Sequence, residues 1–277
     1  MNFTPDDRLV DEVRASPNHG ERRGRRATGG PDLLLLHYTG MPDGRGLSGA
    51  ERAIRWLCDP VSEVSAHYVV DVDGRIVQLV PEGRRAWHAG RSSWGGEEDV
   101  NSASIGIEIV NPGHWWDLAV SPDRDPALPP EIHPGYADFP EAQIAAVIRL
   151  GRAIVARHAI AAERVLAHSD VAPGRKRDPG EKFPWARLAA EGLGLWVAPE
   201  PIVAAAGEPP IAAVQALLAA YGYGIEITGE ADAATAAVVE AFQRHFRPER
   251  VDGVIDVSTV ATLRRLIEVR EARALIV

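Results

Sequence analysis

The 277-residue chain is long enough for one substantial hydrophobic core and a smaller second one, since 45% of its residues are hydrophobic. Its formal net charge of -9 and its pI near 5.5 argue against a nucleic-acid partner, because nucleic acids are bound by basic surfaces. No apolar stretch reaches the ~18 residues of a membrane span, so we expect no insertion into a membrane and no membrane partner.

Residues 1–29 are polar and include the basic cluster Arg22-Arg23-Gly24-Arg25-Arg26, so we expect a flexible N-terminal arm. They lack the apolar core of about 7 to 15 residues that a secretory signal contains. We therefore expect a cytoplasmic protein, or a periplasmic one if further residues precede Met1. The single cysteine, Cys58, excludes an internal disulfide and is interpreted as a small buried hydrophobic side chain.

The first predicted elements alternate between strands and helices. Leu33 to Leu36 is a continuous apolar run, which is typical of a buried strand, and residues 49–59 have the pattern of a short helix. Two further strands are predicted over 66–72 and 75–80. They are joined by Asp73-Gly74, a pair that is typical of a tight hairpin turn.

The middle of the chain continues the alternation. Residues 105–110 are rich in β-branched side chains and predict a core strand. Segment 112–140 is rich in proline and predicts a long loop, and long ordered loops are often functional lids. Pro140 is expected to open a helix with one apolar face, which leads to a strand over 164–168. The sequence therefore predicts an α/β fold with a central mixed β-sheet flanked by helices, over residues 30–196.

The C-terminal region has a different pattern. Residues 197–210 are rich in Pro and Ala, which is typical of a linker. Residues 211–277 are predicted to form a small three-helix domain, because their apolar residues recur at helical spacing. Two similar segments each place an aspartate where it is expected to cap a helix: Gly229, Asp232 and Thr235 in the first, and Gly253, Asp256 and Thr259 in the second.

One loop suggests a metal site, because His168 and Asp178 bracket it after a short apolar run. A catalytic zinc ion takes three protein ligands from His and Asp or Glu and leaves a fourth position for water, so one more histidine is needed. His37 is the natural candidate, since it closes the strand that begins at Leu33 and strand ends present ligands rigidly. The alternatives are that His37 is a satisfied polar group and that the loop pair caps a turn.

Five segments follow one another in a fixed order along residues 30 to 190: Leu36-His37-Tyr38-Thr39, Ser65 to Gly74, Ala86 to Trp94, Ser104 to Asn111 and His168 to Asp178. In this order they resemble the zinc N-acetylmuramoyl-L-alanine amidases, the amidase type 2 family that includes the peptidoglycan recognition proteins. The C-terminal helices resemble the peptidoglycan-binding domain type 1. For them, a plain stabilising appendage is the alternative.

The resemblance implies that His37, His168 and Asp178 bind zinc and that Glu108 and Lys176 serve catalysis. Two neutral imidazoles and one carboxylate would leave the ion a strong Lewis acid, able to lower the pKa of its water to about 7. Glu108 is expected to pass a proton from water to the departing amine, and Lys176 to face the oxyanion. The alternatives are a buried ion pair for Glu108 and a solvated surface patch for Lys176.

Substrate contacts are also implied by the resemblance. Arg175 would meet a carboxylate of the peptide stem. Other residues are predicted to line the sugar and peptide pocket, namely Trp87, His88, Trp94 and Asn111. The alternative is that the aromatic side chains are ordinary core residues, and the set of three metal ligands is complete without His88.

The predicted function is hydrolysis of the amide bond between N-acetylmuramic acid and L-alanine of the stem peptide, in the recycling of 1,6-anhydro muropeptides. Peptidoglycan fragments are the expected partner, and no protein partner is predicted. The alternatives are a periplasmic amidase acting on intact peptidoglycan, a non-catalytic recognition module on the same fold, and a zinc hydrolase of another amide. Hydrolysis is favoured because recognition proteins without activity depart from the metal-binding set, which is complete in this chain.

Overall fold

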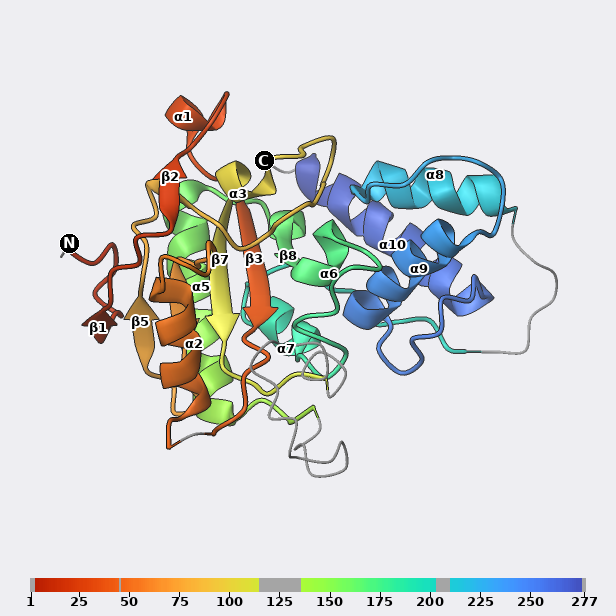
Figure 1. Ribbon diagram of the computed structural model, residues 1–277. Helices are drawn as coiled ribbons and strands as arrows, with labels where there is room; N and C mark the ends of the chain where they lie inside the picture. Colours follow the sequence, from red (N-terminus) through yellow and green to blue (C-terminus); the bar gives the residue numbers. More distant parts are fainter. Residues whose placement is uncertain (1–2, 45, 115–135, 203–209, 276–277) are drawn as a thin grey trace. The chain divides into compact units, whose positions relative to one another are not determined.

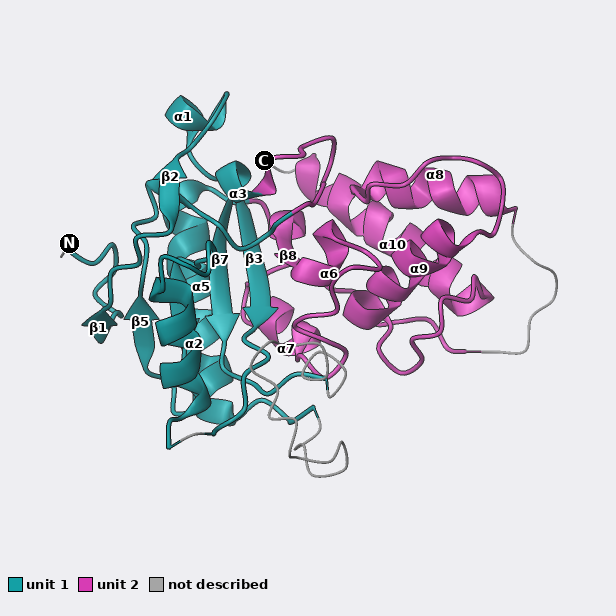
Figure 2. Ribbon diagram, in the orientation of Figure 1, with its two compact units in different colours: residues 1–90, 101–160 teal, residues 91–100, 161–277 magenta. Residues whose placement is uncertain are grey.

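The computed structural model describes residues 3–44, 46–114, 136–202 and 210–275. The chain divides into two compact units (Figure 2). Unit 1 comprises residues 1–90 and 101–160, and unit 2 comprises residues 91–100 and 161–277. Unit 1 contains the larger part of the β-structure, whereas unit 2 is mainly helical.

Unit 1 is built on a mixed β-sheet. Its strands are neighbours in the order β1 (Glu12–Val13), β5 (Ile76–Gln78), β4 (Tyr68–Val70), β7 (Ser104–Ile109) and β3 (Leu33–Tyr38). Strands β4 and β3 both run parallel to β7, whereas β4 and β5 are antiparallel. All six residues of β3 are buried, as the uninterrupted apolar run predicts. The predicted central mixed sheet is confirmed.

Helices α2 (Gly49–Cys58) and α5 (Glu141–His158) cover the two faces of this sheet (Figure 1). The Ser48 hydroxyl accepts a hydrogen bond from the Glu51 main chain and so caps α2, and such a cap contributes about 1 kcal/mol. α5 begins directly after Pro140, as predicted. The apolar face of α2 packs on the sheet in a cluster that includes Ala50, Ile54, Leu57, Val69, Val77 and Leu79.

The hairpin between β4 and β5 turns at Gly74, as predicted. Gly74 has φ +90°, and a Cβ at this position would lie 2.7 Å from the carbonyl oxygen of Ala142 on α5. Only glycine fits such a conformation and such a close approach without strain. The turn is therefore fixed both by its own backbone and by the helix that packs over it.

Cys58, at the end of α2, is partly buried at the edge of the apolar cluster. Its thiol donates to the carbonyl oxygen of Arg14 at 3.4 Å. Burial raises the pKa of Cys58 to about 11, so the reactive thiolate is scarce at neutral pH. The apolar interpretation of this residue agrees with its surroundings.

The N-terminal segment is not the flexible arm that we expected. β1 pairs with β5, and β2 (His19–Glu21) pairs with β6 (Arg84–Ala86). Arg22, from the basic cluster, is buried and donates to the carbonyl oxygens of Glu82, Ser102 and Ser104. The expectation was wrong because the main-chain carbonyls that accept these hydrogen bonds leave no trace in the local sequence.

The same segment continues into one short helix, and a second short helix further along the chain precedes β7. α1 (Arg26–Gly29) places Arg26 in an ion pair with Asp32 at 2.7 Å, and the Arg26 side chain is buried. α3 (Val100–Ala103) leads directly into β7. The N-terminal residues therefore contribute to the core of unit 1.

The second segment of unit 2, residues 161–277, begins with short elements: η2 (Ala162–Arg164), β8 (Val165–Ala167), α6 (His168–Val171) and α7 (Trp185–Ala190). The strand predicted over 164–168 is thus shorter than expected, and His168 is the first residue of α6. Ala167 N–H donates to the Asp170 carboxylate at 2.8 Å, which turns the chain out of the strand.

The C-terminal helices are α8 (Ile211–Tyr221), α9 (Ala233–Phe246) and α10 (Val257–Ala274), as predicted. Asp232 caps α9 by accepting from Thr235 N–H at 2.7 Å, and Asp256 caps α10 by accepting from Thr259 N–H at 2.7 Å. The linker prediction falls partly on residues 203–209, outside the described residues. Within the described ranges, no helix has both the length and the hydropathy that crossing a bilayer requires.

Candidate metal centre and active site

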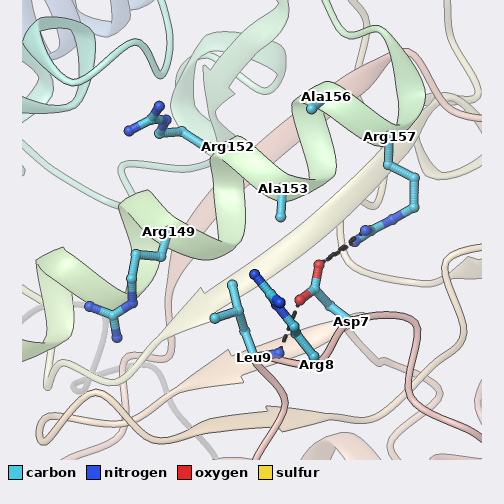
Figure 3. A pocket seen from close by; sticks show the side chains of 8 residues that line it. All are labelled: Asp7, Arg8, Leu9, Arg149, Arg152, Ala153, Ala156 and Arg157. Carbon is cyan, nitrogen blue, oxygen red and sulfur yellow. Dashed lines mark hydrogen bonds and ion pairs between the residues drawn. The ribbon is translucent and has the colours of Figure 1, made fainter.

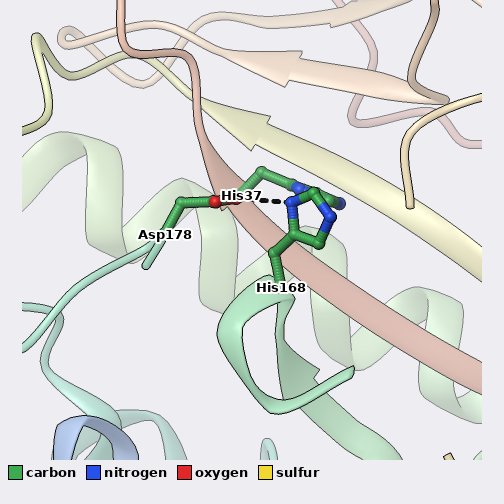
Figure 4. A group of neighbouring side chains, drawn as sticks. All are labelled: His37, His168 and Asp178. Carbon is green, nitrogen blue, oxygen red and sulfur yellow. Dashed lines mark hydrogen bonds and ion pairs between the residues drawn. The ribbon is translucent and has the colours of Figure 1, made fainter. Parts of the chain in front are cut away.

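Three buried side chains form a candidate metal centre, His37, His168 and Asp178 (Figure 4). One ligand atom of each residue lies within 4.8 Å of those of the other two. Nδ1 of His168 lies 2.9 Å from Oδ2 of Asp178. Two imidazoles and one carboxylate gathered in this way match the donors that a catalytic zinc ion takes. The residues present therefore fit the ion that the sequence suggested.

His37 is positioned by the parallel pairing of β3 with β7, in which it lies opposite Glu108. The register follows from the buried apolar residues of both strands, because a slip by one residue would turn His37 to the other face of the sheet. Glu108, the predicted proton carrier, is thereby placed on the strand next to a predicted ligand. Its predicted role is compatible with this position.

His88, which was predicted to line the substrate pocket, lies against His37. Nε2 of His37 is 3.0 Å from Nδ1 of His88, and Nε2 of His88 is 3.3 Å from the Ser104 hydroxyl. A Cβ on Gly106 would come within 2.6 Å of the His88 ring, so the absence of a side chain there makes room for the ring. A partner on the second nitrogen of a ligating histidine fixes its tautomer and ring orientation.

His67 is a structural neighbour of this histidine pair. Its Nδ1 accepts from Gly106 N–H at 3.0 Å, and its ring lies 5.6 Å from that of His88. Burial, followed by the nearby charge of Arg22, lowers the pKa of His67 to about 3. His67 is therefore a neutral core residue that supports β7.

The loop that carries the other two predicted ligands is closed by main-chain hydrogen bonds. Ser169 N–H donates to the Asp178 carbonyl oxygen at 3.1 Å, and Ala172 N–H donates to that of His168 at 3.0 Å. Lys176 N–H also donates to the Ala172 carbonyl oxygen, at 3.0 Å. Lys176, the predicted partner of the oxyanion, is half-buried two residues before Asp178.

Arg175, predicted to bind a substrate carboxylate, is held beside His168. Its Nε and Nη2 donate to the Arg91 carbonyl oxygen at 3.1 and 2.8 Å, and its Nη2 lies 3.4 Å from Nε2 of His168. Burial lowers the pKa of Arg175, while Asp178 opposes that shift. The guanidinium is thus a fixed cation next to one of the predicted ligands.

The remaining predicted pocket residues differ in their surroundings. Trp87 is half-buried, and its main chain pairs with Ser65. Trp94 is 3% exposed and packs at 5.0 Å, ring centre to ring centre, against Tyr223, as the core alternative predicts. Asn111 is buried, and its amide donates to the Ala137 carbonyl oxygen at 3.0 Å, so it orders the chain at the base of the predicted loop.

The central part of the predicted lid, residues 115–135 with Trp115 and Trp116, lies outside the described residues. Its two described ends are close together. The rings of His114 and Tyr136 are stacked at 4.4 Å, and Nδ1 of His114 lies 2.9 Å from the Tyr38 hydroxyl. Tyr38 follows His37 on β3, so the ends of this segment adjoin the strand that carries a predicted ligand.

A separate surface hollow on unit 1 is lined by arginines and lies on another part of the chain (Figure 3). Its lining comprises Asp7, Arg8, Leu9, Arg149, Arg152, Ala153, Ala156 and Arg157. None of these residues belongs to the predicted site. Arg157 is itself engaged with Asp7 at 3.0 Å, so the hollow is partly neutralised.

The mixed β-sheet is flanked by helices, and one of its strands contributes to a buried cluster of two histidines and one aspartate. This is the architecture of a metal-dependent hydrolase. Residues 27–181 match the family model of N-acetylmuramoyl-L-alanine amidase, and residues 207–263 match that of a peptidoglycan binding domain. The chain therefore belongs to the N-acetylmuramoyl-L-alanine amidase family. Both resemblances noted in the sequence are confirmed, and the chain is an enzyme of this class.

Individual relatives agree with this assignment. The chain is 36% identical over 249 residues to the N-acetylmuramoyl-L-alanine amidase AmiD of Escherichia coli (strain K12), covering 85% of this chain and 82% of the relative. It is 35% identical over 171 residues to the 1,6-anhydro-N-acetylmuramyl-L-alanine amidase AmpD of Citrobacter freundii, covering 58% of this chain and 80% of the relative.

A solved structure shares the fold over nearly the whole chain. It is the complex of the amidase AmiD from E. coli with the substrate anhydro-N-acetylmuramic acid-L-Ala-D-gamma-Glu-L-Lys. The TM-score is 0.70 at 34% identity, with 91% of this chain and 97% of that chain covered. The similarity extends through the C-terminal helices, because a catalytic domain alone would not reach this coverage.

Proposed function

We propose that this enzyme hydrolyses the amide bond between the lactyl group of N-acetylmuramic acid and L-alanine in soluble 1,6-anhydro muropeptides, with zinc bound by His37, His168 and Asp178. The observation that carries the proposal is the buried His37–His168–Asp178 cluster on an amidase fold. A zinc ion held there would supply Lewis-acid activation of a water molecule and of the scissile carbonyl.

The proton transfers are assigned to Glu108. Hydrolysis forms a bond from the water oxygen to the acyl carbon and breaks the bond from that carbon to the alanine nitrogen. The carboxylate of Glu108 accepts the proton that the water loses and returns it to the alanine nitrogen, which leaves as an amine. The position of Glu108 opposite His37 on the neighbouring strand supports this role.

The two cations of the loop take charge-stabilising roles. Lys176 is half-buried, and its ammonium faces the oxygen of the scissile carbonyl as negative charge develops on it. Arg175 binds a carboxylate of the peptide stem, as its fixed position beside His168 allows. Trp87 and Asn111 shape the pocket wall, and His88 orients His37.

The proposed substrate class rests on the relatives. AmpD of Citrobacter freundii is named for the 1,6-anhydro sugar, and the AmiD structure holds an anhydro-muramyl tripeptide as substrate. The match of residues 207–263 to a peptidoglycan binding domain favours a second candidate, an amidase that acts on the intact wall. A cytoplasmic location would go with the first candidate, and a periplasmic location with the second.

One experiment separates these candidates. The purified zinc-loaded enzyme is given anhydro-muropeptides, the corresponding non-anhydro muropeptides and purified sacculi, and the peptides released are identified by mass spectrometry. We expect free stem peptide with L-alanine at its N-terminus, formed fastest from the anhydro substrates. Faster release from sacculi, together with a periplasmic location on cell fractionation, would favour the second candidate, and release of no peptide would refute both.

A further inference from the structure

Asp170 is a fully buried carboxylate two residues after His168, and it is not a member of the candidate metal centre. It accepts three hydrogen bonds. Ala167 N–H donates to its Oδ2 at 2.8 Å, the Tyr223 hydroxyl donates to its Oδ1 at 2.7 Å, and Nδ1 of His245 lies 2.6 Å from its Oδ2. A buried carboxylate is costly unless it is satisfied in this way, so the four groups form one unit, the Asp170 hub.

The two side-chain donors of the hub come from the C-terminal region. Tyr223 lies two residues after the end of α8, and His245 is on α9. Both lie in the stretch 207–263 that matches the peptidoglycan binding domain, and both belong to unit 2, as Asp170 does. The hub is therefore a connection within one compact unit, between the helical region and the loop of the predicted ligands.

The donor directions follow from the surroundings of each group. Burial, and after it the neighbouring charge of Asp170, raise the pKa of Tyr223 well above its ordinary value, so the phenol keeps its proton and donates it. Ala167 N–H and the phenol both donate to Asp170, and Nδ1 of His245 is assigned as the third donor to this carboxylate. His245 is held in place because its ring stacks on those of Trp185 and Phe246, with distances between ring centres of 3.7 and 3.8 Å.

The Asp170 hub holds the backbone from which the predicted ligands project. α6 has only four residues, too few to be stable on its own hydrogen bonds. Asp170 closes its first turn by accepting from Ala167, so His168 leaves the strand at a fixed angle. Ser169 N–H then donates to the Asp178 carbonyl oxygen, which ties the second ligand to the same turn.

A second connection runs through the loop that begins at Arg91. Gly95 N–H donates to the Gly222 carbonyl oxygen at 2.8 Å, and a Cβ on Gly222 would lie 2.6 Å from the Trp94 ring. The carbonyl oxygen of Arg91 in turn accepts from Arg175. The turn at Gly222 and Tyr223 thus supports two features: the turn at Asp170, through the Tyr223 hydroxyl, and Arg175, through the loop that begins at Arg91.

We propose that Tyr223 and His245 are positioning residues for the metal centre and act through Asp170. The C-terminal helical region would then support catalysis in addition to being a candidate for peptidoglycan binding. The proposal rests on the proposed function in one respect, the assignment of His168 and Asp178 as ligands. It goes beyond that function because it gives the helical region a task inside the catalytic reaction.

The chain supplies a matched pair of tyrosines for the test. Tyr223 and Tyr221 are 3% and 4% exposed, and both pack on Trp94. Among the described contacts, the Tyr223 hydroxyl binds Asp170, whereas the Tyr221 hydroxyl has no hydrogen bond. Tyr223→Phe is expected to weaken zinc binding by about 3- to 10-fold in chelator competition, since even direct partners of metal ligands are worth about 10- to 100-fold. Tyr221→Phe is expected to stay within about twofold.

His245 provides a rescue experiment on the same hub. The side-chain nitrogen of asparagine reaches about the position of Nδ1, so His245→Asn keeps the donor that His245→Leu removes. We expect His245→Leu to weaken zinc binding by about 10-fold and His245→Asn to recover most of the loss. With zinc in excess, kcat should return close to the wild-type value with KM unchanged. A purely structural role would lower the melting temperature and leave the zinc affinity of the folded enzyme unchanged.

The outcomes separate the two proposals. Zinc content and peptide release by the wild-type enzyme test the proposed function, whereas the ratio of variant to wild-type zinc affinity tests the hub. If the wild-type enzyme binds zinc and both Tyr223→Phe and His245→Leu bind it equally tightly, the inference is overturned and the proposed function stands. Weakened binding in these two variants, with Tyr221→Phe and His245→Asn near wild type, supports the inference.

Discussion

The two histidines of the candidate centre are held by different kinds of hydrogen bonds. His37 belongs to a six-residue strand in a parallel ladder, so main-chain groups fix its backbone. His168 begins a four-residue helix whose first turn is closed by the Asp170 side chain. A ladder tolerates most side-chain substitutions, whereas a turn closed by side chains depends on residues far away in the sequence. We therefore expect the backbone that carries His37 to be robust, and the backbone that carries His168 to be sensitive to substitution of the side chains that close its turn.

A second buried carboxylate shows what is special about the Asp170 hub. Glu82 also accepts from a tyrosine hydroxyl, that of Tyr68 at 2.7 Å, and it lies 2.7 Å from Nε2 of His158. Arg157 adds an ion pair at 2.8 Å. The chemistry resembles that of Asp170, but Glu82 ties α5 to the strands of unit 1 and is not next to a predicted ligand. We expect Glu82 to govern stability and Asp170 to govern metal affinity.

The largest effect is expected from removing a predicted ligand on either side. His37→Ala and Asp178→Ala should each lower bound zinc far below one per chain. They should also reduce kcat/KM on the order of 10³-fold, because the zinc ion that acts as a Lewis acid on water is lost. Metal analysis of the purified variants and peptide-release rates measure this. His19→Ala, a histidine outside the centre, serves as control. Full zinc occupancy in both ligand variants would refute the assignment.

Removing the proposed proton carrier or the proposed oxyanion partner should separate chemistry from metal binding on both sides. Glu108→Gln tests the strand side and Lys176→Ala the loop side. Each is expected to keep zinc while kcat falls on the order of 10²-fold. Arg177→Ala, the neighbouring cation, is the control and should change kcat by less than about threefold. Unchanged kcat in Glu108→Gln would place the base elsewhere, and a rise in KM alone would make Lys176 a binding residue.

A smaller effect is expected from the side-chain support on the strand side. His88→Ala removes the partner of His37 and should weaken zinc binding by about 10-fold, because tautomer and ring orientation are then less well defined. His88→Asn, which keeps a polar group near Nδ1, should lose less. If His88 only contacts substrate, KM will rise and zinc affinity will stay unchanged in a chelator titration.

The smallest effect on the reaction is expected from Glu82. Burial alone would raise the pKa of Glu82, but hydrogen bonds from His158, Arg157 and Tyr68 lower it to about 2. The folded-state pKa is thus below the unfolded value of about 4.3, so the stability from this group is present above pH 4.3 and lost as the pH falls towards 2. Thermal melts between pH 6 and pH 2.5 should show a shallower pH dependence in Glu82→Gln, while zinc affinity at pH 7 stays unchanged.

A matched control strengthens this last measurement. Glu21 is an exposed carboxylate paired with Arg84, and exposed ion pairs contribute little to stability. Glu21→Gln should therefore keep the wild-type pH dependence. An equally steep acid transition in Glu82→Gln would show that other carboxylates dominate acid unfolding.

Much of the fold was predictable because it depends on local patterns. The apolar run before His37, the Asp73-Gly74 turn and the caps at Asp232 and Asp256 each specify an element from adjacent residues, and each is confirmed. The three predicted metal ligands are also gathered by the fold, since motif order fixes which strand end and which loop carry them. Their binding of zinc and the catalytic roles stay predictions.

The remaining features were not predictable, for a physical reason. The Asp170 hub joins residues that are 53 and 75 positions apart, and no periodicity links them. The basic N-terminal segment looked solvent-exposed, yet Arg22 is buried because carbonyl groups of two distant segments accept its donors. An aspartate two residues after a predicted ligand was the one local signal of the hub, since a carboxylate placed there serves to close a turn.

Gly106 on β7 is expected to be sensitive to substitution although it has no side chain. Because the ring of His88 occupies the space that a Cβ would need, any substitution, even to alanine, forces the imidazole that contacts His37 to shift. In a complete mutational scan of this enzyme, position 106 should be about as intolerant as position 88, whose ring it makes room for. A ranking of sites by mutational sensitivity would then include a glycine that performs no chemistry, and only the crowding around it explains why.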